Sequence, residues 1–387
     1  MQRCFVFEFK IDTAKLNKSE FEKLKFSFVQ CKWLYNYLLS LKDISSFDIK
    51  NREIYSLDKN GNKIKRTLTI PSKFIQGTYK VLMQNIIALS RVKKKNRKIG
   101  KLKFKSEYNC IELNQYGITH LIKNGKFKIT GSKKHFKVFG LEQLKKEYEF
   151  ANAKLIQKPT GYYIKLTCFE NLTQNRINKP TQEVGLDFGI KTHITTSDGE
   201  KFNISIEESE RIKGLQKKLA RQIKGSNNRK RTIHKLQIEY EKLNNRKKDR
   251  ANKLIHYLCT KYSTIYMQDE MVRLWHKGLF GKQVQHSCLG LIKAKLKMQN
   301  NVKVIQSSFP STKVCYKCGT IHSTITLKDR DFTCPSCGFK EDRDIKAAKT
   351  ILFVGQVNNT YIPMEHRNTD MERVLDLNSK SYSSSSH

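Results

Sequence analysis

The chain has 387 residues, of which 38% are hydrophobic, and its 75 Lys and Arg against 35 Asp and Glu give a formal net charge of +40. Such a surplus destabilises a compact chain by self-repulsion unless a polyanion neutralises it, and nucleic acid is favoured over the rival partner, an anionic membrane surface. We find no apolar run long enough to span a bilayer and no signal-peptide core, so we expect a protein that is neither membrane-spanning nor secreted.

The first half of the sequence predicts a β-rich region interrupted by helices. Residues 5–11 alternate apolar and polar side chains, as in a strand with one buried face. Residues 19–22 have the form of a capping box that opens a helix, and a second helix is predicted over 71–89. Alternation returns at 161–168, and the polar stretch 171–179 is predicted to be a linker.

The second half predicts strands separated by basic helices. Residues 184–204 are typical of a strand pair with a turn at 198–199, and 206–260 are strongly helical in pattern and very basic. Buried strands are predicted at 264–268 and 302–307.

Four of the ten cysteines form a pattern. Cys315 and Cys318 make one Cys-x2-Cys pair, and Cys334 and Cys337 make a second after a spacer of 15 residues. This spacing is typical of a Cys4 zinc ribbon, in which Zn²⁺ is held structurally because no coordination position stays open. The alternative is a pair of disulfides, which a reducing compartment disfavours. His322 is predicted to be a loop residue, since the four ligands are already present.

Candidate carboxylates stand at three separate places. Gly185, Asp187 and Gly189 share one face of a predicted strand, and glycines beside a carboxylate let a metal or a phosphate approach. The predicted strand at 264–268 is followed by two acids, and Asp344 falls in the first turn of a helix that follows the second cysteine pair. Taken singly, each has a plainer interpretation as a turn residue, a solvent-facing strand end or a helix cap.

Dense runs of Lys and Arg are predicted to contact phosphates, although a charge run can also be only a solvated face. Trp33, Tyr35, Tyr162 and Tyr163 could stack on unpaired bases, but core packing is the favoured interpretation. The candidate nucleic-acid-binding residues are Lys93, Lys94, Lys95, Arg97, Lys98, Arg229, Lys230, Arg231, Arg246 and Lys247.

Five linked stretches resemble one family in the same order. They are 184–191 (VGLDFGIK), 225–231 (GSNNRKR), 245–249 (NRKKD), 309–315 (FPSTKVC) and 342–348 (DRDIKAA). Together with the cysteine pattern, they resemble TnpB, the family of transposon-encoded nucleases related to the type V CRISPR effectors. The resemblance runs over nearly the whole chain.

The resemblance implies an α+β multidomain fold. Its expected parts are a wedge β-barrel at 1–16 and 93–182, a helical recognition domain at 17–92, an RNase H-like RuvC nuclease domain at 183–312 and 339–365 with a basic helical insertion at 206–260, a zinc ribbon at 313–338, and a disordered tail at 366–387.

The same resemblance implies an RNA-guided DNA endonuclease. Asp187, Glu270 and Asp344 would hold two catalytic Mg²⁺ ions, and one structural Zn²⁺ would fill the ribbon. Cleavage would leave a 3′ hydroxyl and a 5′ phosphate. The implied partners are a guide RNA from the transposon end and double-stranded target DNA that carries a short adjacent motif. The implied location is the prokaryotic cytoplasm, at the nucleoid, and no protein oligomer is evident.

Two positions depart from the family pattern. The family has Glu-Asp-Leu after the later strand, where this chain has Gln268, Asp269 and Glu270, and Lys346 stands where Asn is usual. Glu270 faces the same side of an extended segment as Gln268, so we expect Glu270 to supply the second carboxylate.

Two alternatives to a nuclease remain. The first is a nuclease-inactive RNA-guided DNA-binding repressor, because a neutral Gln268 is a weak metal ligand. The other is a transposase or an accessory of transposition. It ranks third, after the nuclease and the repressor, because no separate Tyr nucleophile motif is evident.

Overall fold

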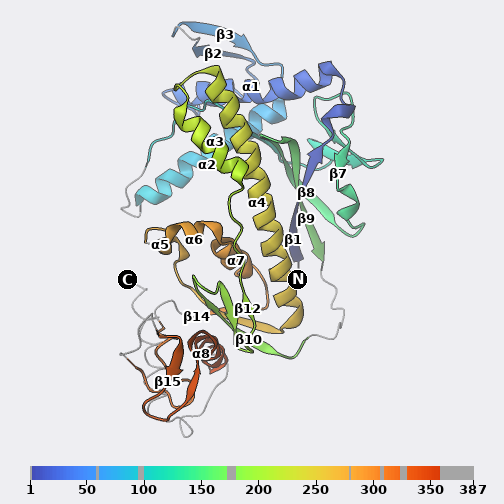
Figure 1. Ribbon diagram of the computed structural model, residues 1–387. Coiled ribbons are helices and arrows are strands. Elements are labelled where there is room, and N and C mark those ends of the chain that lie inside the picture. Colours follow the sequence, from blue (N-terminus) through green and yellow to red (C-terminus); the bar gives the residue numbers. More distant parts are fainter. Residues whose placement is uncertain are drawn as a thin grey trace. The chain divides into compact units, whose positions relative to one another are not determined.

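The computed structural model in Figure 1 describes residues 2–57, 61–94, 100–171, 180–278, 280–305, 309–322 and 329–357. The chain divides into two compact units, Met1–Asn175 and Arg176–His387, and each is described by itself. No described helix combines the length and the apolarity that a membrane crossing needs. Lys95, Arg97, Lys98 and the predicted tail lie outside the described residues.

An antiparallel sheet of five strands forms the centre of the first unit, with the order β4-β8-β9-β1-β7. The predicted strand at 5–11 lies within β1, and Phe9 and Leu166 belong to the buried core. Tyr35 and Tyr162 are also buried there, which favours the core-packing interpretation of these two rings. The strands are β1 (Gln2–Ile11), β4 (Cys110–Leu113), β7 (Val138–Phe139), β8 (Glu149–Lys158) and β9 (Gly161–Asn171).

Helices and small hairpins complete this unit. The predicted capping box is wrong, because Asn17 is the N-cap: its side chain accepts the Glu20 N–H at 2.8 Å, so Ser19 already lies inside the helix. The region between the two long helices also holds a hairpin that the helical prediction did not include. The elements are α1 (Lys18–Ser40), α2 (Ser72–Lys94), β2 (Glu53–Leu57), β3 (Lys63–Thr67), β5 (His120–Lys123), β6 (Lys126–Ile129), and the short 3-10 turns Thr13–Lys15 and Leu141–Gln143.

The second unit is built on a mixed sheet of five strands with the order β12-β11-β10-β13-β14. β10 pairs antiparallel with β11 and parallel with β13, and β13 pairs parallel with β14. The sequence predicts a pair of strands over 184–204, but the structure has three strands there. The predicted turn at 198–199 lies between the second and the third of them. The strands are β10 (Glu183–Phe188), β11 (Ile194–Thr196), β12 (Lys201–Phe202), β13 (Thr264–Gln268) and β14 (Val302–Ile305).

The helix α8 (Arg343–Val357) packs directly on this sheet. A Cβ at Gly185 would lie 2.1 Å from the carbonyl oxygen of Ala348, and one at Gly355 would lie 2.1 Å from the Tyr266 ring. Because glycine has no side chain at these two positions, the helix and the sheet can approach closely. The expectation that Gly185 makes room for a metal or a phosphate is wrong, because α8 fills that space.

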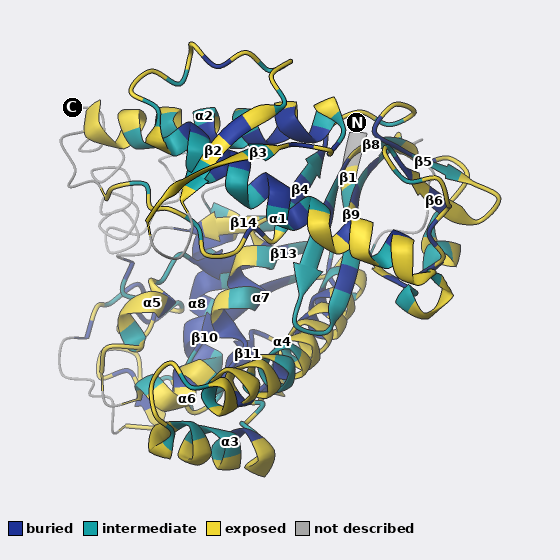
Figure 2. Ribbon diagram, turned by 90° about the horizontal axis from the view of Figure 1, so that it is seen from above, coloured by how far each residue is buried: buried dark blue, intermediate teal, exposed yellow. Residues whose placement is uncertain are grey.

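The remaining helices differ in exposure. Figure 2 shows α8 as largely buried, whereas α4 has many exposed residues along its length. The other elements of this unit are α3 (Glu210–Arg221), α4 (Asn227–Lys261), α5 (Val272–Trp275), α6 (Gly281–His286), α7 (Leu289–Leu296), β15 (Asp331–Thr333) and β16 (Lys340–Asp342).

Candidate carboxylate centre and cysteine cluster

Three elements bring the predicted carboxylates toward one edge of the sheet. Asp187 is near the end of β10, and Glu270 follows the end of β13. Since β10 and β13 run parallel, with Leu186 opposite Met267, their carboxyl ends meet at the same edge. Asp344 lies in the first turn of α8, which packs on both strands.

Asp187 interacts electrostatically with both of the other carboxylates. Burial raises its pKa well above the usual value for aspartate, and the neighbouring Glu270 and Asp344 raise it further. Arg343 and Lys346 act in the opposite direction. Because such coupling weakens with distance, these shifts place the three carboxylates in one neighbourhood.

Glu270, which follows the end of β13, is the second predicted carboxylate of this neighbourhood. Its side chain is 22% exposed, and its Oε2 atom is buried without a hydrogen-bond partner, 3.5 Å from the Lys293 ammonium. Burial raises the pKa of Glu270, and Lys293 opposes that rise. Asp269 instead forms an ion pair with Lys297 at the surface.

Gln268 has a structural role in this neighbourhood. Its Nε2 donates to the Phe309 carbonyl at 2.6 Å, and its Oε1 accepts the Ser311 hydroxyl at 3.0 Å. The side chain is 3% exposed. Both ends of the amide therefore hold the segment that leads into the cysteine cluster.

Lys346 holds the same segment from α8. Its ammonium is fully buried and donates to the carbonyls of Ser311, Thr312 and Val314 at 3.1, 2.6 and 2.9 Å. It also lies 4.1 Å from the Phe332 ring centroid. Burial lowers its pKa to about 8. The two departures from the family pattern thus contact one residue, Ser311.

The start of α8 positions Asp344. The Asp342 carboxylate accepts the backbone N–H groups of Asp344 and Ile345 at 3.0 and 3.1 Å, which is the N-cap that the sequence predicts. Arg343 lies 3.7 Å from the Asp344 carboxylate. The cap fixes the first helical turn, and the side chain of Asp344 stays 24% exposed at the edge of the group.

The carboxylate set fits a hard divalent cation. All three side chains offer oxygen ligands, and the orphaned Oε2 of Glu270 is a buried acceptor that a cation would satisfy. Among the described residues, however, these oxygens are not gathered as tightly as the cysteine sulfurs described next.

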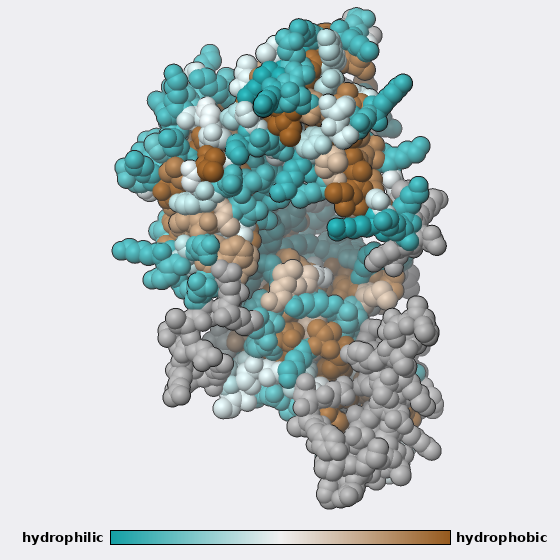
Figure 3. Space-filling view, turned by 180° about the vertical axis from the view of Figure 1, so that it is seen from behind, coloured by the Kyte–Doolittle hydropathy of each residue, from teal (hydrophilic) through white to brown (hydrophobic). Residues whose placement is uncertain are grey.

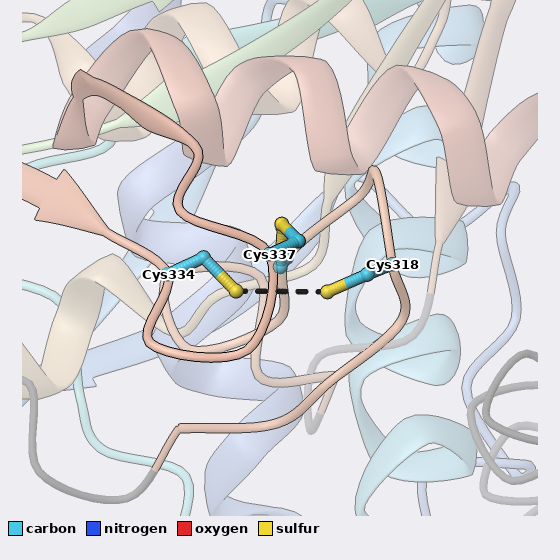
Figure 4. A group of neighbouring side chains, drawn as sticks. Cys318, Cys334 and Cys337 are labelled. Carbon is cyan, nitrogen blue, oxygen red and sulfur yellow. Dashed lines mark hydrogen bonds between the residues drawn. The ribbon is translucent and has the colours of Figure 1, made fainter.

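The four predicted cysteines come together in a cluster that could hold one metal ion. Their sulfur atoms all lie within 4.8 Å of one another. Figure 4 shows Cys318 and Cys334 pointing toward each other from two separate turns, with their sulfurs 3.6 Å apart. All four are free thiols, so the alternative of two disulfides is not present in the structure.

His322 contacts this cluster and is more than a loop residue. Its Nε2 lies 3.2 Å from the Cys334 sulfur, its side chain is buried, and its ring packs against Phe332. The imidazole can thus orient a ligand sulfur without being one of the four ligands.

The predicted nucleic-acid-binding residues divide by exposure. Lys93 and Lys94 are exposed at the end of α2, and Lys230, Arg231 and Arg246 are exposed on α4.

Two other residues of the predicted set have partners within the protein. Arg229 donates to the Leu219 and Gln222 carbonyls at the end of α3, and Lys247 donates to the Gln285 carbonyl at 2.6 Å. Arg229 therefore joins two helices.

Lys293 is a residue of this neighbourhood that the sequence did not single out. It lies on α7 among Leu289, Ile292 and Leu296, all of them buried, and it is itself 4% exposed. A lysine within the apolar face of a short helix is the signal that could have identified it, because an unpaired buried charge is costly.

Two family models match consecutive parts of the chain. One, described as "Cas12f1-like, TNB domain", matches residues 288–351, which include Lys293, the cysteines and Asp344. The other, OrfB_IS605, described as "Probable transposase", matches residues 167–272, which include Asp187 and Glu270.

A curated protein of Streptomyces pristinaespiralis, named "Putative RNA-guided DNA endonuclease", is 30% identical over 203 residues, 50% of this chain and 50% of the relative. The chain therefore spans about half the length of the curated relative it matches. A solved structure of a mini-RNA-guided endonuclease, CRISPR-Cas_phi3, aligns with 11% identity and a TM-score of 0.36 over 62% of this chain and 58% of that chain.

Proposed function

We propose that this TnpB-like chain is an RNA-guided DNA endonuclease whose catalytic centre is formed by Asp187, Glu270 and Asp344. The observation that carries the proposal is that Asp187 near the end of β10, Glu270 after the parallel β13 and Asp344 in the first turn of α8 lie toward one edge of the sheet. The raised pKa of Asp187 agrees with this arrangement. In a two-metal nuclease, carboxylates converge in this way on the scissile phosphate.

The strand order of the second unit supports an RNase H-like RuvC domain. An antiparallel three-strand meander continues into two parallel strands, and α8 covers the sheet where the first strand carries its aspartate. We assign 183–312 and 339–365 to this domain, with 206–260 as its basic insertion and 313–338 as the ribbon. We assign 1–16 and 93–182 to the wedge barrel and 17–92 to the recognition domain, as the resemblance implies; the first unit holds these ranges as far as Asn175.

The chain's own residues would bind and orient the reacting groups. Asp187, Glu270 and Asp344 would hold two Mg²⁺ ions, which when bound supply Lewis-acid activation of water and of the phosphate. Asp342 fixes the helix turn that presents Asp344. The four cysteines would hold one Zn²⁺ that stabilises the ribbon and the segment in front of it.

Guide RNA and target DNA would be held mainly by phosphate contacts. α4 carries eleven Lys or Arg against three acids, and hydrophilic residues cover much of the face in Figure 3. Exposed Lys230 and Arg231 are suited to phosphates, whereas Arg229 is engaged with α3. Replacing Lys230 and Arg231 by Gln should lower the salt dependence of RNA binding by about one unit of log–log slope per residue, measured by filter binding.

The decisive test is cleavage of a plasmid by the protein purified with its co-expressed RNA. Mg²⁺-dependent cutting at the guided sequence is expected, and Asp187→Ala should bind the same target without cutting it. Absence of any guided binding by the parent complex would refute the proposal.

The RNA-guided repressor is the second candidate function. It is favoured by Gln268, whose amide is used for packing and brings no charge to the centre. If the parent complex binds the guided target but does not cut it, and Gln268→Glu gains cleavage, then the native protein is a repressor and not a nuclease.

A further inference from the structure

Lys293 introduces a positive charge into the carboxylate neighbourhood from an element that carries none of the carboxylates. Its ammonium donates to the backbone carbonyl of Glu270 at 2.9 Å and lies 3.5 Å from the Glu270 Oε2. The second contact is longer than the 2.7–2.9 Å typical of a charge-assisted hydrogen bond. The Oε2 atom is therefore attracted by Lys293 but keeps its lone pairs.

The ammonium has other partners besides this carboxylate. It lies 4.8 Å from the ring centroid of Phe188, the residue after Asp187, and it keeps the Glu270 carbonyl as an acceptor. Lys293 can thus lose its interaction with Oε2 and still retain a hydrogen bond and an aromatic face.

Three acidic and three basic side chains belong to this neighbourhood. Asp187, Glu270 and Asp344 stand against three buried or nearly buried cations, which are Lys293, Arg343 and Lys346. Arg343 lies beside Asp344, and Lys346 is enclosed by carbonyls, so Lys293 is the cation that contacts the orphaned oxygen. A divalent cation that binds there must overcome repulsion from this ammonium.

We propose that Lys293 is a positioning residue that acts as the resident counter-cation of the centre: it holds Glu270 in place while no metal is bound, and it weakens divalent-cation binding until Glu270 is released. The inference rests on the proposed function, because it takes Glu270 as a metal ligand. The scissile phosphate, which brings negative charge, would then favour loading of the metal on the DNA-bound complex.

Mn²⁺ titration of the RNA-bound protein without DNA tests the proposal. Only the Mn²⁺ binding that is lost in Asp187→Asn is counted. This subtraction excludes the Mn²⁺ ions that the RNA itself binds. Lys293→Met should tighten this binding by at least about tenfold, because a charge next to the site is removed, and Lys293→Gln should do the same. Lys293→Arg, which keeps the charge, should stay near the parent affinity.

Lys297→Met is the matched control. Lys297 lies one turn further along, is 39% exposed, and pairs with Asp269. Its loss removes the same charge without touching Glu270, so the affinity should change by less than about twofold, because exposed charges are screened.

Three results would overturn the inference. Unchanged or weaker Mn²⁺ binding in folded Lys293→Met and Lys293→Gln would mean that Lys293 only supports Glu270. An equal increase in Lys297→Met would mean that net charge alone matters. If no Mn²⁺ binding depends on Asp187 in any variant, the proposed catalytic centre fails as well. This outcome distinguishes failure of the proposed function from failure of the Lys293 inference alone.

Discussion

The cysteine cluster and the carboxylate centre are two candidate metal sites in the same unit, but they are assembled differently. The cysteines come from one local stretch, Cys315 to Cys337, and their sulfurs lie within 4.8 Å of one another. The carboxylates come from positions as far apart as Asp187 and Asp344, and Lys293 and Arg343 lie beside two of them.

This difference follows from the ligands. Most thiols are neutral at neutral pH, so two tight turns can bring four of them together with little charge repulsion. Carboxylates are charged at neutral pH and repel one another, so the fold must provide burial or counter-cations to hold them. A cysteine cluster can therefore be predicted from spacing in the sequence, whereas a carboxylate centre depends on the tertiary structure.

The largest effect is expected from breaking the cysteine cluster. Cys318→Ser should abolish stoichiometric zinc binding, measured by metal analysis, and unfold the ribbon, because structural zinc contributes about 10 kcal/mol to the folding of small zinc domains. Cys259→Ser, outside the cluster, is the control. Stoichiometric zinc in Cys318→Ser, or no zinc in well-folded parent protein, would contradict the assignment.

A smaller but still large effect is expected at the carboxylate centre. Glu270→Gln should reduce Mg²⁺-dependent cleavage several hundredfold or more while guided DNA binding persists, since losing one ligand removes several kcal/mol of Lewis-acid stabilisation, and about 1.4 kcal/mol is tenfold in rate. Asp269→Asn, which removes a surface ion pair, should cut nearly normally. Normal cutting by Glu270→Gln would place the second ligand elsewhere.

The smallest effect concerns stability. The raised pKa of Asp187 favours its protonated form in the folded state. The contribution of Asp187 to the stability of the folded state is therefore fully present below the ordinary pKa of aspartate. It is lost as the pH rises through the raised pKa. At pH 7.5 without divalent cations, Asp187→Asn should be more stable than the parent, by about 1.4 kcal/mol for each unit of the shift.

Thermal unfolding of the two proteins measures this difference. It should disappear near pH 4 and reverse in excess Mg²⁺, which stabilises only the parent. A parent as stable as Asp187→Asn at pH 7.5 would show that the carboxylates are not in electrostatic conflict.

The sequence predicts the local features and misses the non-local ones. The meeting of four cysteines is confirmed, because a short spacer and two turns determine it. The role of Glu270 stays a prediction, and its contact with Lys293 depends on the tertiary fold, although the lysine within the apolar face of α7 is a signal that the sequence offers. The sequence gives no signal for the hairpin β2–β3, because none of the residues of β3 is buried and its pattern therefore shows no alternation.

The buried Lys346 has a consequence for the order in which the unit is assembled. An ammonium deprived of its three carbonyl partners would be costly to bury, so α8 can settle on the sheet only after residues 311–314 are in place. Synthesis supplies these residues before α8 and leaves the Gly185 face of the sheet uncovered until the helix emerges. A chain arrested before Arg343 would therefore have its basic helices but lack Asp344, so the proposed capacity to bind nucleic acid would precede the proposed capacity to cut it.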